Sequence, residues 1–381
     1  MAAPSKRPHE AGDTGFGERC QLKQACIDLS HTDSGESALD RFMRWAECNN
    51  FHVSKKVCVG KGGSCAQYGM VAVSDISEGE VLFQIPRPML LSPQTSAIAE
   101  LLNAEKASTE SVSGWVPLLL SLIYEYHNPR STWRPYLDLV PDFSEQDLPM
   151  FWPRAEMEAE LRGTGVVEAV LRDLKSISRE FETIVLPFVK KHKTIFASTE
   201  CESLEFYKKM VAFVMAYSFT EPLQSFDGEE SDEEGEITSP PMMIPMADIL
   251  NHVAKNNAHL LFEKDCLKMV AAKDIKKGEE VFNTYGELPN WQLLQMYGFA
   301  EAYPLNHFDT VEVPVRLLVE SASDLAVNSA DLMEEKKKFL QSLDLIDRGT
   351  FVVGREGILT DEELEPILKV HVYIVTMPAS M

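Results

Sequence analysis

Closely spaced cysteine pairs are absent from this sequence. Its 7 cysteines stand at positions 20, 26, 48, 58, 65, 201 and 266, and no two form a Cys-x-x-Cys pair. Structural zinc sites are usually built from such pairs, and the 9 histidines do not cluster at metal-ligand spacing either. We therefore expect no metal site. The odd number of cysteines, together with the lack of a secretory signal, favours reduced thiols in the cytosol or nucleus.

Long hydrophobic runs are also absent. The longest, such as Val211–Tyr217, fall far short of the roughly 20 apolar residues that a membrane-spanning helix requires. Lys6, Arg7 and Pro8 near the N-terminus are followed by no apolar stretch, so no secretory signal is recognised and no membrane partner is expected. The basic residues could serve nuclear import, although a solvated tail explains them more simply.

Positive charge is scarce: 36 Lys and Arg stand against 59 Asp and Glu, for a formal net charge of −23. This balance argues against direct nucleic-acid binding, which needs a basic face. It is compatible with a basic peptide partner, but acidity that only keeps the protein soluble explains the charge equally well. Phosphate-loop, Gly-x-Ser-x-Gly and His-Glu-x-x-His motifs are missing too, which disfavours three other kinds of enzyme.

The 381 residues, of which 45% are hydrophobic, are enough for two or three domains with packed cores. Composition predicts a disordered tail over 1–36 and an exposed acidic loop over 227–236. Residue spacing predicts the following elements: a helix from Ser37; short strands from Val53 to Ile85; a mainly helical region over about 95–220, with helices Trp115–Tyr126 and Leu204–Tyr217; short strands from Met242 to Val281; a helix Pro289–Tyr297; and a mostly helical pattern after Thr310, with a capping box of Thr360 and Glu363.

The segment from Val73 to Phe83 resembles the segment from Ala272 to Phe282. Both contain the pattern Asp-Ile-x-x-Gly-Glu and read as a strand, a glycine turn and a second strand. The alternative is coincidence, because Gly-Glu turns between strands are common. The repetition predicts one β domain that is interrupted by a helical insert.

Two polar motifs stand among apolar neighbours: Asn251-His252, and the run Phe282-Asn283-Thr284-Tyr285-Gly286. A buried polar group without a hydrogen bond costs about 1–3 kcal/mol, so these residues either satisfy backbone groups or face a ligand. The two motifs together, at this spacing, resemble the SET-domain methyltransferases. The family's N-terminal Gly-x-Gly strand start corresponds to Ala66-Gln67-Tyr68-Gly69, where Gln67 replaces the first glycine.

The helical insert and the missing cysteine-rich segment are similar to the Rubisco large-subunit methyltransferase-like branch of this family. The resemblance runs from about residue 38 to about residue 369. It implies an α+β fold, with a knot-like SET core of short strands over 37–305 and a helical insert over about 95–240. A partial helical substrate-binding domain, cut short relative to the family, would follow over 306–381.

The resemblance also implies roles for individual residues. Tyr285 would be the catalytic tyrosine, and S-adenosylmethionine would be the cofactor. The residues that resemble cofactor-binding positions are Ala66, Gln67, Tyr68, Tyr217, Asn251, His252 and Tyr297. Those that resemble positions lining a lysine channel are Trp115, Ser218 and Thr220. Plain core packing is the alternative for Tyr285, Tyr297 and Trp115.

By resemblance, the expected activity is protein-lysine N-methylation. In that family's reaction, a narrow apolar channel would lower the pKa of the substrate lysine and so free its lone pair. By resemblance, the substrate would be a lysine in a basic extended segment of a nuclear protein, such as the RelA subunit of NF-kappa-B or a histone tail. The enzyme would add one methyl group to this lysine and would act in transcription regulation. Its expected location is the nucleus and also the cytoplasm. Two alternatives remain open: a protein-histidine methyltransferase, and a SET-fold binding adaptor without turnover.

Overall fold

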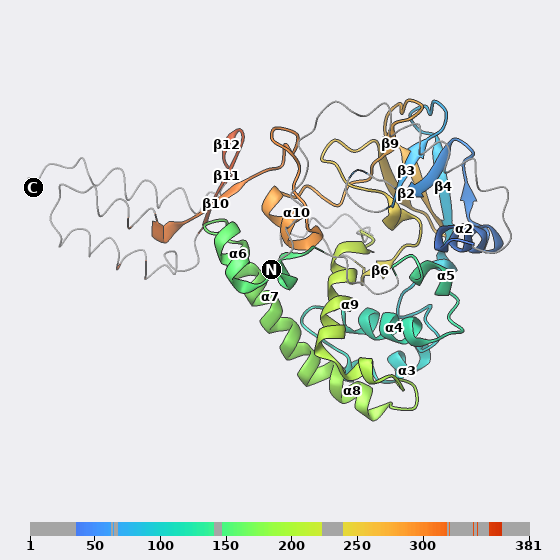
Figure 1. Ribbon diagram of the computed structural model, residues 1–381, viewed down its shortest axis with the longest axis horizontal. Helices are drawn as coiled ribbons and strands as arrows, with labels where there is room; N and C mark the ends of the chain where they lie inside the picture. Colours follow the sequence, from blue (N-terminus) through green and yellow to red (C-terminus); the bar gives the residue numbers. More distant parts are fainter. Residues whose placement is uncertain are drawn as a thin grey trace, which may run out of the picture. The chain divides into compact units, whose positions relative to one another are not determined.

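The computed structural model describes residues 36–61, 64, 68–140, 147–222, 239–317, 320, 338, 341 and 350–359. The chain separates into two compact units (Figure 1). Unit 1 comprises 1–144 and 180–284, and unit 2 comprises 145–179 and 285–381. Three predicted features lie outside the described residues: the tail predicted over 1–36, except for its last residue Glu36, the acidic run 227–236, and the capping box of Thr360 and Glu363. The domain boundaries that we placed at 37 and 306 stay predictions.

The main sheet of unit 1 combines strands from both sides of the helical insert. Its antiparallel order is β1-β4-β8-β7, so β4 from the N-terminal part pairs with β8 from the C-terminal part. The strands are β1 (His52–Val53), β4 (Val81–Pro86), β7 (Ala258–Phe262) and β8 (Cys266–Ala271). Phe83 and Met269 are paired in register and buried, which anchors the sheet in the core. The predicted interrupted β domain is confirmed.

Two smaller sheets complete the β structure of unit 1. Strands β2 (Val57–Lys61), β3 (Tyr68–Ala72) and β9 (Glu280–Val281) form a sheet in which Met70 pairs with Val281. Strands β5 (Ser218–Phe219) and β6 (Met242–Met243) form a two-stranded ribbon. Strand β9 lies near the end of the second of the two similar segments, so the three-stranded sheet also joins distant parts of the chain.

The two similar sequence segments pair with each other. The amide of Ile76 donates to the carbonyl of Ile275 at 2.9 Å, and the amide of Ile275 donates back to Ile76 at the same distance. The aspartate before each isoleucine also accepts a hydrogen bond from the backbone of the other segment. Asp274 Oδ1 accepts from the Glu78 amide at 3.0 Å, and Asp75 Oδ1 accepts from the Lys277 amide at 2.9 Å. The sequence repetition therefore reflects an approximate two-fold pairing of two hairpins.

The helices of unit 1 begin and end close to their predicted positions. Helix α2 (Ala38–Cys48) starts at Ser37, which forms a capping box with Asp40. The long insert helices are α4 (Val116–His127) and α9 (Leu204–Tyr217), and they pack against each other. The remaining elements are η2 (Arg87–Met89), α3 (Ala99–Ala104), η3 (Lys106–Ser108), α5 (Arg134–Leu137), η5 (Phe181–Val185), α8 (Leu186–Lys191), η6 (Thr199–Glu202) and η7 (Ala247–Ile249).

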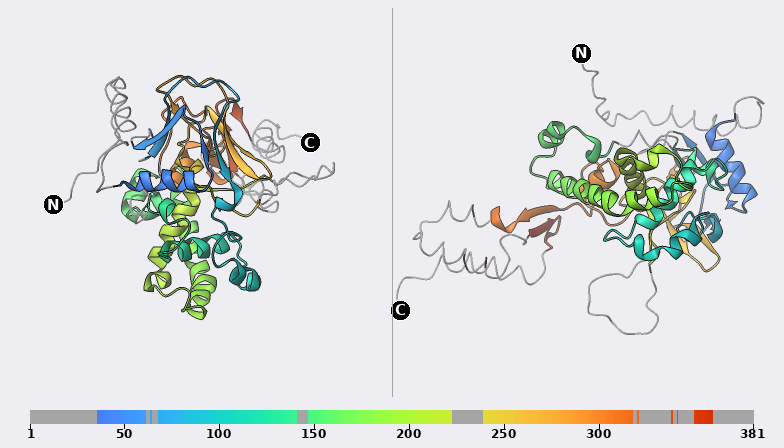
Figure 2. Two further views of the ribbon diagram at one scale, coloured as in Figure 1. Left: turned by 90° about the vertical axis from the view of Figure 1, so that its right-hand side faces the viewer. Right: turned by 90° about the horizontal axis from the view of Figure 1, so that it is seen from below.

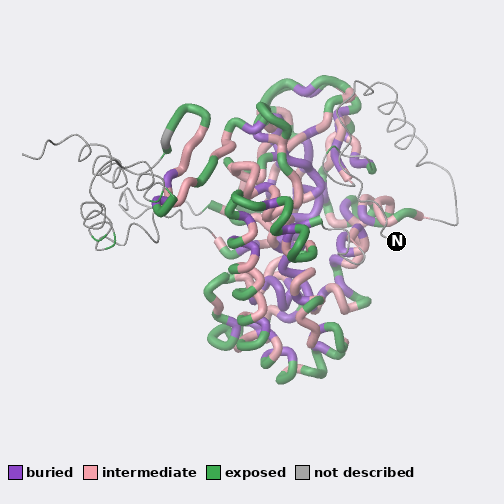
Figure 3. The backbone as a smooth tube through the Cα atoms, turned by 60° about the vertical axis from the view of Figure 1, so that its left-hand side comes forward, coloured by how far each residue is buried: buried purple, intermediate pink, exposed green. Residues whose placement is uncertain are grey.

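Those insert helices that belong to unit 1 gather on one side of its strands (Figure 2, left). Buried stretches of chain run through the interior of both the helical part and the β part (Figure 3). Leu118, Leu119, Leu120 and Leu122 of α4 are all at most 1% exposed, so α4 is enclosed on nearly every side. The insert thus has a hydrophobic core of its own.

Unit 2 contains η4 (Pro149–Phe151), α6 (Arg154–Glu160), α7 (Val166–Glu180, whose last residue belongs to unit 1) and α10 (Asn290–Tyr297). Met157, Leu161, Val166 and Val170 form its buried cluster, against which Trp291 of α10 packs. Strands β10 (Val311–Pro314), β11 (Thr350–Gly354) and β12 (Gly357–Ile358) form an antiparallel sheet.

The prediction of a mostly helical pattern after Thr310 is wrong for these strands. The segments Val311–Pro314 and Thr350–Gly354 are rich in valine and pair directly with each other, Val313 opposite Phe351. Branched side chains pack well on a pleated sheet, and pairing partners some 40 residues away leave no local periodic signal.

Three of the described cysteines, Cys48, Cys201 and Cys266, carry free thiols. Cys58 is disulfide-bonded, so the expectation of reduced thiols is wrong at that position. None of the described helices is both long enough and apolar enough to cross a membrane. Among the described residues, no group of three or more His, Cys, Asp or Glu is arranged to hold a metal ion.

Candidate functional site

The two polar motifs of the sequence meet in unit 1. Asn251 and His252 follow η7 and are 2% and 1% exposed. The carbonyl of Asn251 accepts from the amide of Asn283 at 2.9 Å, and His252 forms a parallel bridge with Asn283. Asn283 is itself only 3% exposed. Tertiary pairing therefore brings the Asn251-His252 motif beside the chain that leads to Tyr285.

The side-chain amide of Asn251 joins two further segments. Its Nδ2 donates to the Tyr68 carbonyl at 3.2 Å and to Glu280 Oε1 at 2.7 Å. The other oxygen of the same carboxylate, Oε2, accepts from the Ser64 amide at 3.1 Å. Ala66 and Gln67 lie outside the described residues. Glu280 and Asn251 therefore hold Ser64 and Tyr68, which flank the predicted cofactor strand start in sequence.

Glu280 carries no role in the sequence analysis, although it stands in the motif strand. The only available signal was an acidic residue next to a buried valine at the end of a strand. A third buried amide, Asn257, supports the same strand: its Nδ2 donates to the Glu280 carbonyl at 2.9 Å, and its Oδ1 accepts from the Phe282 amide at 2.7 Å. The motif strand is thus fixed by side chains from the 251–257 segment.

His252 is held as a neutral imidazole at physiological pH. Burial lowers the pKa of His252 to about 4, because a charged ring loses its hydration in the interior. A neutral imidazole carries one N–H donor and one acceptor nitrogen. That chemistry suits hydrogen bonding to an uncharged heterocycle and does not suit an ion pair.

Two of the three predicted lysine-channel residues, Ser218 and Thr220, lie just beyond the end of α9. Tyr217 is the last residue of α9, Ser218 opens strand β5 opposite Met243, and Thr220 is exposed just beyond. Trp115 stands directly before α4, which packs against α9. Tyr217, Ser218 and Trp115 are all half-buried. The structure places Ser218 and Thr220 on one short segment, and it places Trp115 directly before the neighbouring helix α4.

Asp248 lies three residues before Asn251 and was missed from the sequence. The Tyr136 hydroxyl donates to Asp248 Oδ2 at 2.5 Å, and burial raises the pKa of Asp248 to about 7. Burial, followed by the charge of Asp248, also raises the pKa of Tyr217. A carboxylate inside the apolar run from Met242 to Leu250 was a signal that the sequence offered.

Tyr285, Tyr297 and Phe299 form an aromatic cluster in unit 2. The ring centroids of Tyr285 and Tyr297 are 4.6 Å apart, and each lies 6.4 Å from that of Phe299. Burial raises the pKa of Tyr297 to about 12, so its phenol stays protonated at physiological pH. Phe299 carried no assigned role in the sequence, because an apolar residue after a helix gives no functional signal.

The candidate site residues thus divide between the two units. Those of unit 1 are Tyr68, Trp115, Tyr217, Ser218, Thr220, Asn251 and His252, and those of unit 2 are Tyr285 and Tyr297. Within unit 1 the structure brings Tyr68 and Asn251 into direct hydrogen bonding. Within unit 2 it brings Tyr285 and Tyr297 into ring contact. The catalytic and binding roles of these residues stay predictions.

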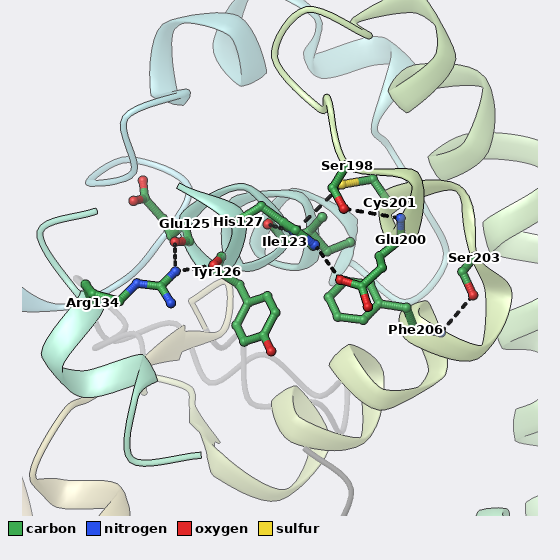
Figure 4. Close-up of polar contacts among 10 residues, drawn as sticks. All are labelled: Ile123, Glu125, Tyr126, His127, Arg134, Ser198, Glu200, Cys201, Ser203 and Phe206. Carbon is green, nitrogen blue, oxygen red and sulfur yellow. Dashed lines mark hydrogen bonds and ion pairs between the residues drawn. The ribbon is translucent and has the colours of Figure 1, made fainter. Parts of the chain in front are cut away.

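A second polar cluster, around His127 and Cys201, has the composition of a nucleophilic site without its geometry (Figure 4). Nε2 of His127 contacts Glu200 Oε2 at 3.1 Å, but Nδ1 bonds to the Ile123 carbonyl at 2.9 Å and lies 3.8 Å from Cys201 Sγ. Burial raises the pKa of the Cys201 thiol to about 11, whereas an activated cysteine needs a lowered value. The cluster ties the end of α4 to η6.

Comparison with known proteins adds the family context. Residues 67–286 match the SET domain family. The N-lysine methyltransferase setd6 of Xenopus laevis is 45% identical over 351 residues, which cover 91% of this chain and 76% of that protein. The human N-lysine methyltransferase SETD6 is 43% identical over 389 residues and is matched by 100% of this chain, over 80% of its own length.

Among solved structures, the chain is similar to the SET domain of LSMT bound to lysine and AdoHcy, with a TM-score of 0.62 and 20% identity. That match covers 88% of this chain and 70% of the other. Rubisco LSMT bound to AdoMet gives a TM-score of 0.61 over 88% of this chain and 71% of the other, also at 20% identity. At this level of identity the structural match establishes the fold.

Proposed function

The chain belongs to the SET-domain family and is an S-adenosylmethionine-dependent protein-lysine N-methyltransferase, and from this premise we propose that it monomethylates a lysine in a basic segment of nuclear proteins. The RelA subunit of NF-kappa-B is the first proposed substrate, and a histone tail is the second. The similarity to the N-lysine methyltransferases SETD6 supports a lysine as the methyl acceptor. The net charge of −23 supports it too, because long-range attraction draws in a basic peptide.

The residues of the chain fit the proposed cofactor. When bound, S-adenosylmethionine supplies a methyl group on a cationic sulfur. A cation gains about 0.5–2 kcal/mol from the face of an aromatic ring, and unit 2 offers the rings of Tyr285, Tyr297 and Phe299 together. Unit 1 offers the neutral His252 and the tethered Tyr68 strand for the polar parts of the molecule.

Tyr285 is proposed to orient the reacting amine through its hydroxyl. Methyl transfer is an in-line displacement, so most of the acceleration comes from alignment and from the exclusion of water. The stacked ring of Tyr297 restricts the Tyr285 ring and thereby holds the hydroxyl in one direction. The chain needs no covalent intermediate for this reaction.

Monomethylation is supported by the second phenol of the cluster. Tyr297 places its hydroxyl-bearing ring within 4.6 Å of the Tyr285 ring, measured between centroids. A phenol takes up more room than a phenyl ring and can bond a partly methylated amine, so it disfavours a second methyl group in a confined site. Removing that hydroxyl should relax the limit without removing the ring.

The test is mass spectrometry of lysine peptides from RelA and a histone tail after incubation with enzyme and labelled donor. The expected product carries one methyl group, and none forms on peptides in which the lysine is replaced by arginine or histidine. Tyr297→Phe should add a second methyl group, whereas Tyr303→Phe, which removes a phenol from an 88% exposed ring of the same unit, should not. Methylation of the histidine peptide, or silence on both lysine peptides, would reject the proposed substrates.

The proposed nuclear location has a separate test. A fluorescent fusion of the full chain should accumulate in the nucleus, with a cytoplasmic fraction. Exclusion of the fusion from the nucleus would contradict a nuclear substrate and would leave the lysine methyltransferase activity unaffected.

A further inference from the structure

We propose that the Asp248 carboxylate accepts the proton of the incoming lysine ammonium, while the Tyr136 hydroxyl holds this carboxylate in place. The inference rests on lysine methylation as the reaction, and it is independent of whether RelA or a histone tail is the substrate. Four observations carry it: an unsatisfied buried oxygen, the hydrogen bond from Tyr136, the neighbouring Tyr217, and a contrasting carboxylate elsewhere in the same unit.

The carboxylate of Asp248 is only half satisfied. Oδ2 accepts from the hydroxyl of Tyr136, a residue of α5 that is 4% exposed. Oδ1 is out of contact with solvent and has no hydrogen-bond partner among the described residues. The residue as a whole is partly buried, and it is this oxygen that is enclosed. A buried carboxylate oxygen left unpaired costs free energy, and a contact with a ligand's donor would return it.

Two titratable groups face Asp248, each from a different element. Tyr136 comes from α5 and Tyr217 from α9, and the pKa of each is raised first by burial and then by the charge of Asp248. The carboxylate is therefore close to Tyr217, whose successor Ser218 opens the segment assigned to the lysine channel. The pKa of Asp248 itself is raised by burial to about 7, and the Tyr136 hydrogen bond and the amides of Asp248 and Met246 offset part of this rise.

The proton transfer is balanced within the site. One N–H bond of the ammonium breaks, an O–H bond forms at Asp248 Oδ1, and a cation and an anion become a neutral amine and a neutral acid. Desolvation disfavours both charged forms, so a dry site shifts this equilibrium toward the neutral pair. The amine lone pair is then free to attack, and Asp248 returns its proton to water before the next turnover.

The same unit contains a tyrosine–carboxylate pair that serves only the fold. Tyr207, which is 1% exposed, donates to Glu180 Oε1 at 2.7 Å. The other oxygen of Glu180 accepts from the Ser113 hydroxyl at 2.5 Å, so both oxygens are satisfied. Asp248 differs because its second oxygen is left open. The Tyr207–Glu180 pair is therefore structural, whereas the Tyr136–Asp248 pair has an oxygen that can accept a proton.

The first test is the pH profile of apparent kcat/KM on a degenerate mixture of lysine peptides. In the wild-type enzyme the value should fall about tenfold per pH unit below a midpoint near 7. Asp248→Asn should remove that midpoint. Tyr136→Phe should move it upward by about one unit, because the ionised carboxylate loses a donor. Tyr207→Phe, the matched control, should leave the midpoint in place. An unchanged midpoint in both Asp248→Asn and Tyr136→Phe overturns the proposal.

The second test needs neither turnover nor cofactor. The infrared difference between the wild-type protein and Asp248→Asn should contain a protonated carboxyl band with a midpoint near pH 7, and Tyr136→Phe should show the same band at higher pH. A midpoint near the ordinary aspartate value overturns the proposal. If the asparagine variant is misfolded, the difference between the wild type and Tyr136→Phe takes its place, because their two carboxyl bands should have different midpoints. If the enzyme methylates the peptide mixture but not the RelA and histone peptides, the proposed substrates are wrong and the proposed role of Asp248 is unaffected.

Discussion

The side-chain amide of Asn251 and the carboxylate of Glu280 are joined by a hydrogen bond of 2.7 Å across 29 residues of chain. The same two residues bind the Tyr68 carbonyl and the Ser64 amide. A charge-assisted bond to a buried amide is among the stronger hydrogen bonds in proteins. The pair therefore fixes the predicted cofactor strand to the Asn-His motif, and its loss should affect both stability and cofactor binding.

Replacement of Glu280 by alanine should lower the free energy of unfolding by about 2–3 kcal/mol, since Asn251 and Ser64 lose a charged acceptor. The affinity for S-adenosylmethionine should fall about tenfold, which corresponds to about 1.4 kcal/mol. Urea denaturation and calorimetry measure the two effects. Glu280→Gln keeps one acceptor oxygen and should lie between alanine and the wild type. Unchanged cofactor affinity in both variants would show that the pair serves the fold alone.

Replacement of Tyr285 by phenylalanine should reduce kcat about 100-fold, the size of effect expected when a reacting group is misplaced by about 1 Å. The ring contact with Tyr297 is kept, so the melting temperature should stay close to that of the wild type. A methyl-transfer assay and thermal denaturation check the two outcomes. Wild-type turnover in this variant would remove the Tyr285 hydroxyl from the mechanism.

Replacement of Gly298 by alanine should destabilise unit 2 by about 2–3 kcal/mol, through a left-handed backbone and a steric clash. Gly298 ends α10 at φ +78°, and a Cβ there would lie 2.8 Å from the Asp147 carbonyl oxygen. Gly163, at φ +80°, has nothing within 4 Å of a built Cβ. The Gly163→Ala control should therefore cost only about 1 kcal/mol. Equal losses for the two variants in urea denaturation would remove the clash from the account.

The stability contributed by a neutral His252 should be lost as the pH falls. Its pKa is about 4 in the folded protein against 6.5 for the free side chain, so the unfolded state binds more protons in this window. The loss should accumulate from pH 6.5 down to pH 4 and reach about 3 kcal/mol, from 1.36 kcal/mol per unit. Asp248 has the opposite effect on stability, because its pKa is raised in the folded protein and its contribution grows as the pH falls. It therefore offsets part of the loss of unfolding free energy that His252 causes.

The measurement for His252 is therefore a difference: the free energy of unfolding of the wild type minus that of His252→Gln, at several pH values. His259→Gln controls for removal of an imidazole from another strand of the unit. A difference that stays constant from pH 6.5 to pH 4 would show that folding leaves the pKa of His252 unchanged.

Short-range features of the sequence predicted much of this fold. Ser37 and Asp40 form a local capping box, and the helices at Val116–His127, Leu204–Tyr217 and Asn290–Tyr297 follow from their spacing of apolar residues. The strands at Val311–Pro314 and Thr350–Gly354 escaped prediction, because pairing with a distant segment decided their conformation. Propensity is a weak guide where tertiary pairing can override it.

For the site, the sequence by itself determined which chemical groups are present: Asn251, His252 and Tyr285 in motifs whose joint spacing identifies the SET family. Only the tertiary structure decided which groups meet. It joined Asn251 to Glu280, paired Ile76 with Ile275, and enclosed Asp248 beside Tyr136. The physical reason is that burial sets hydration, and with it the pKa values of His252 and Asp248. Burial depends on segments more than 100 residues apart, whose approach no local pattern records.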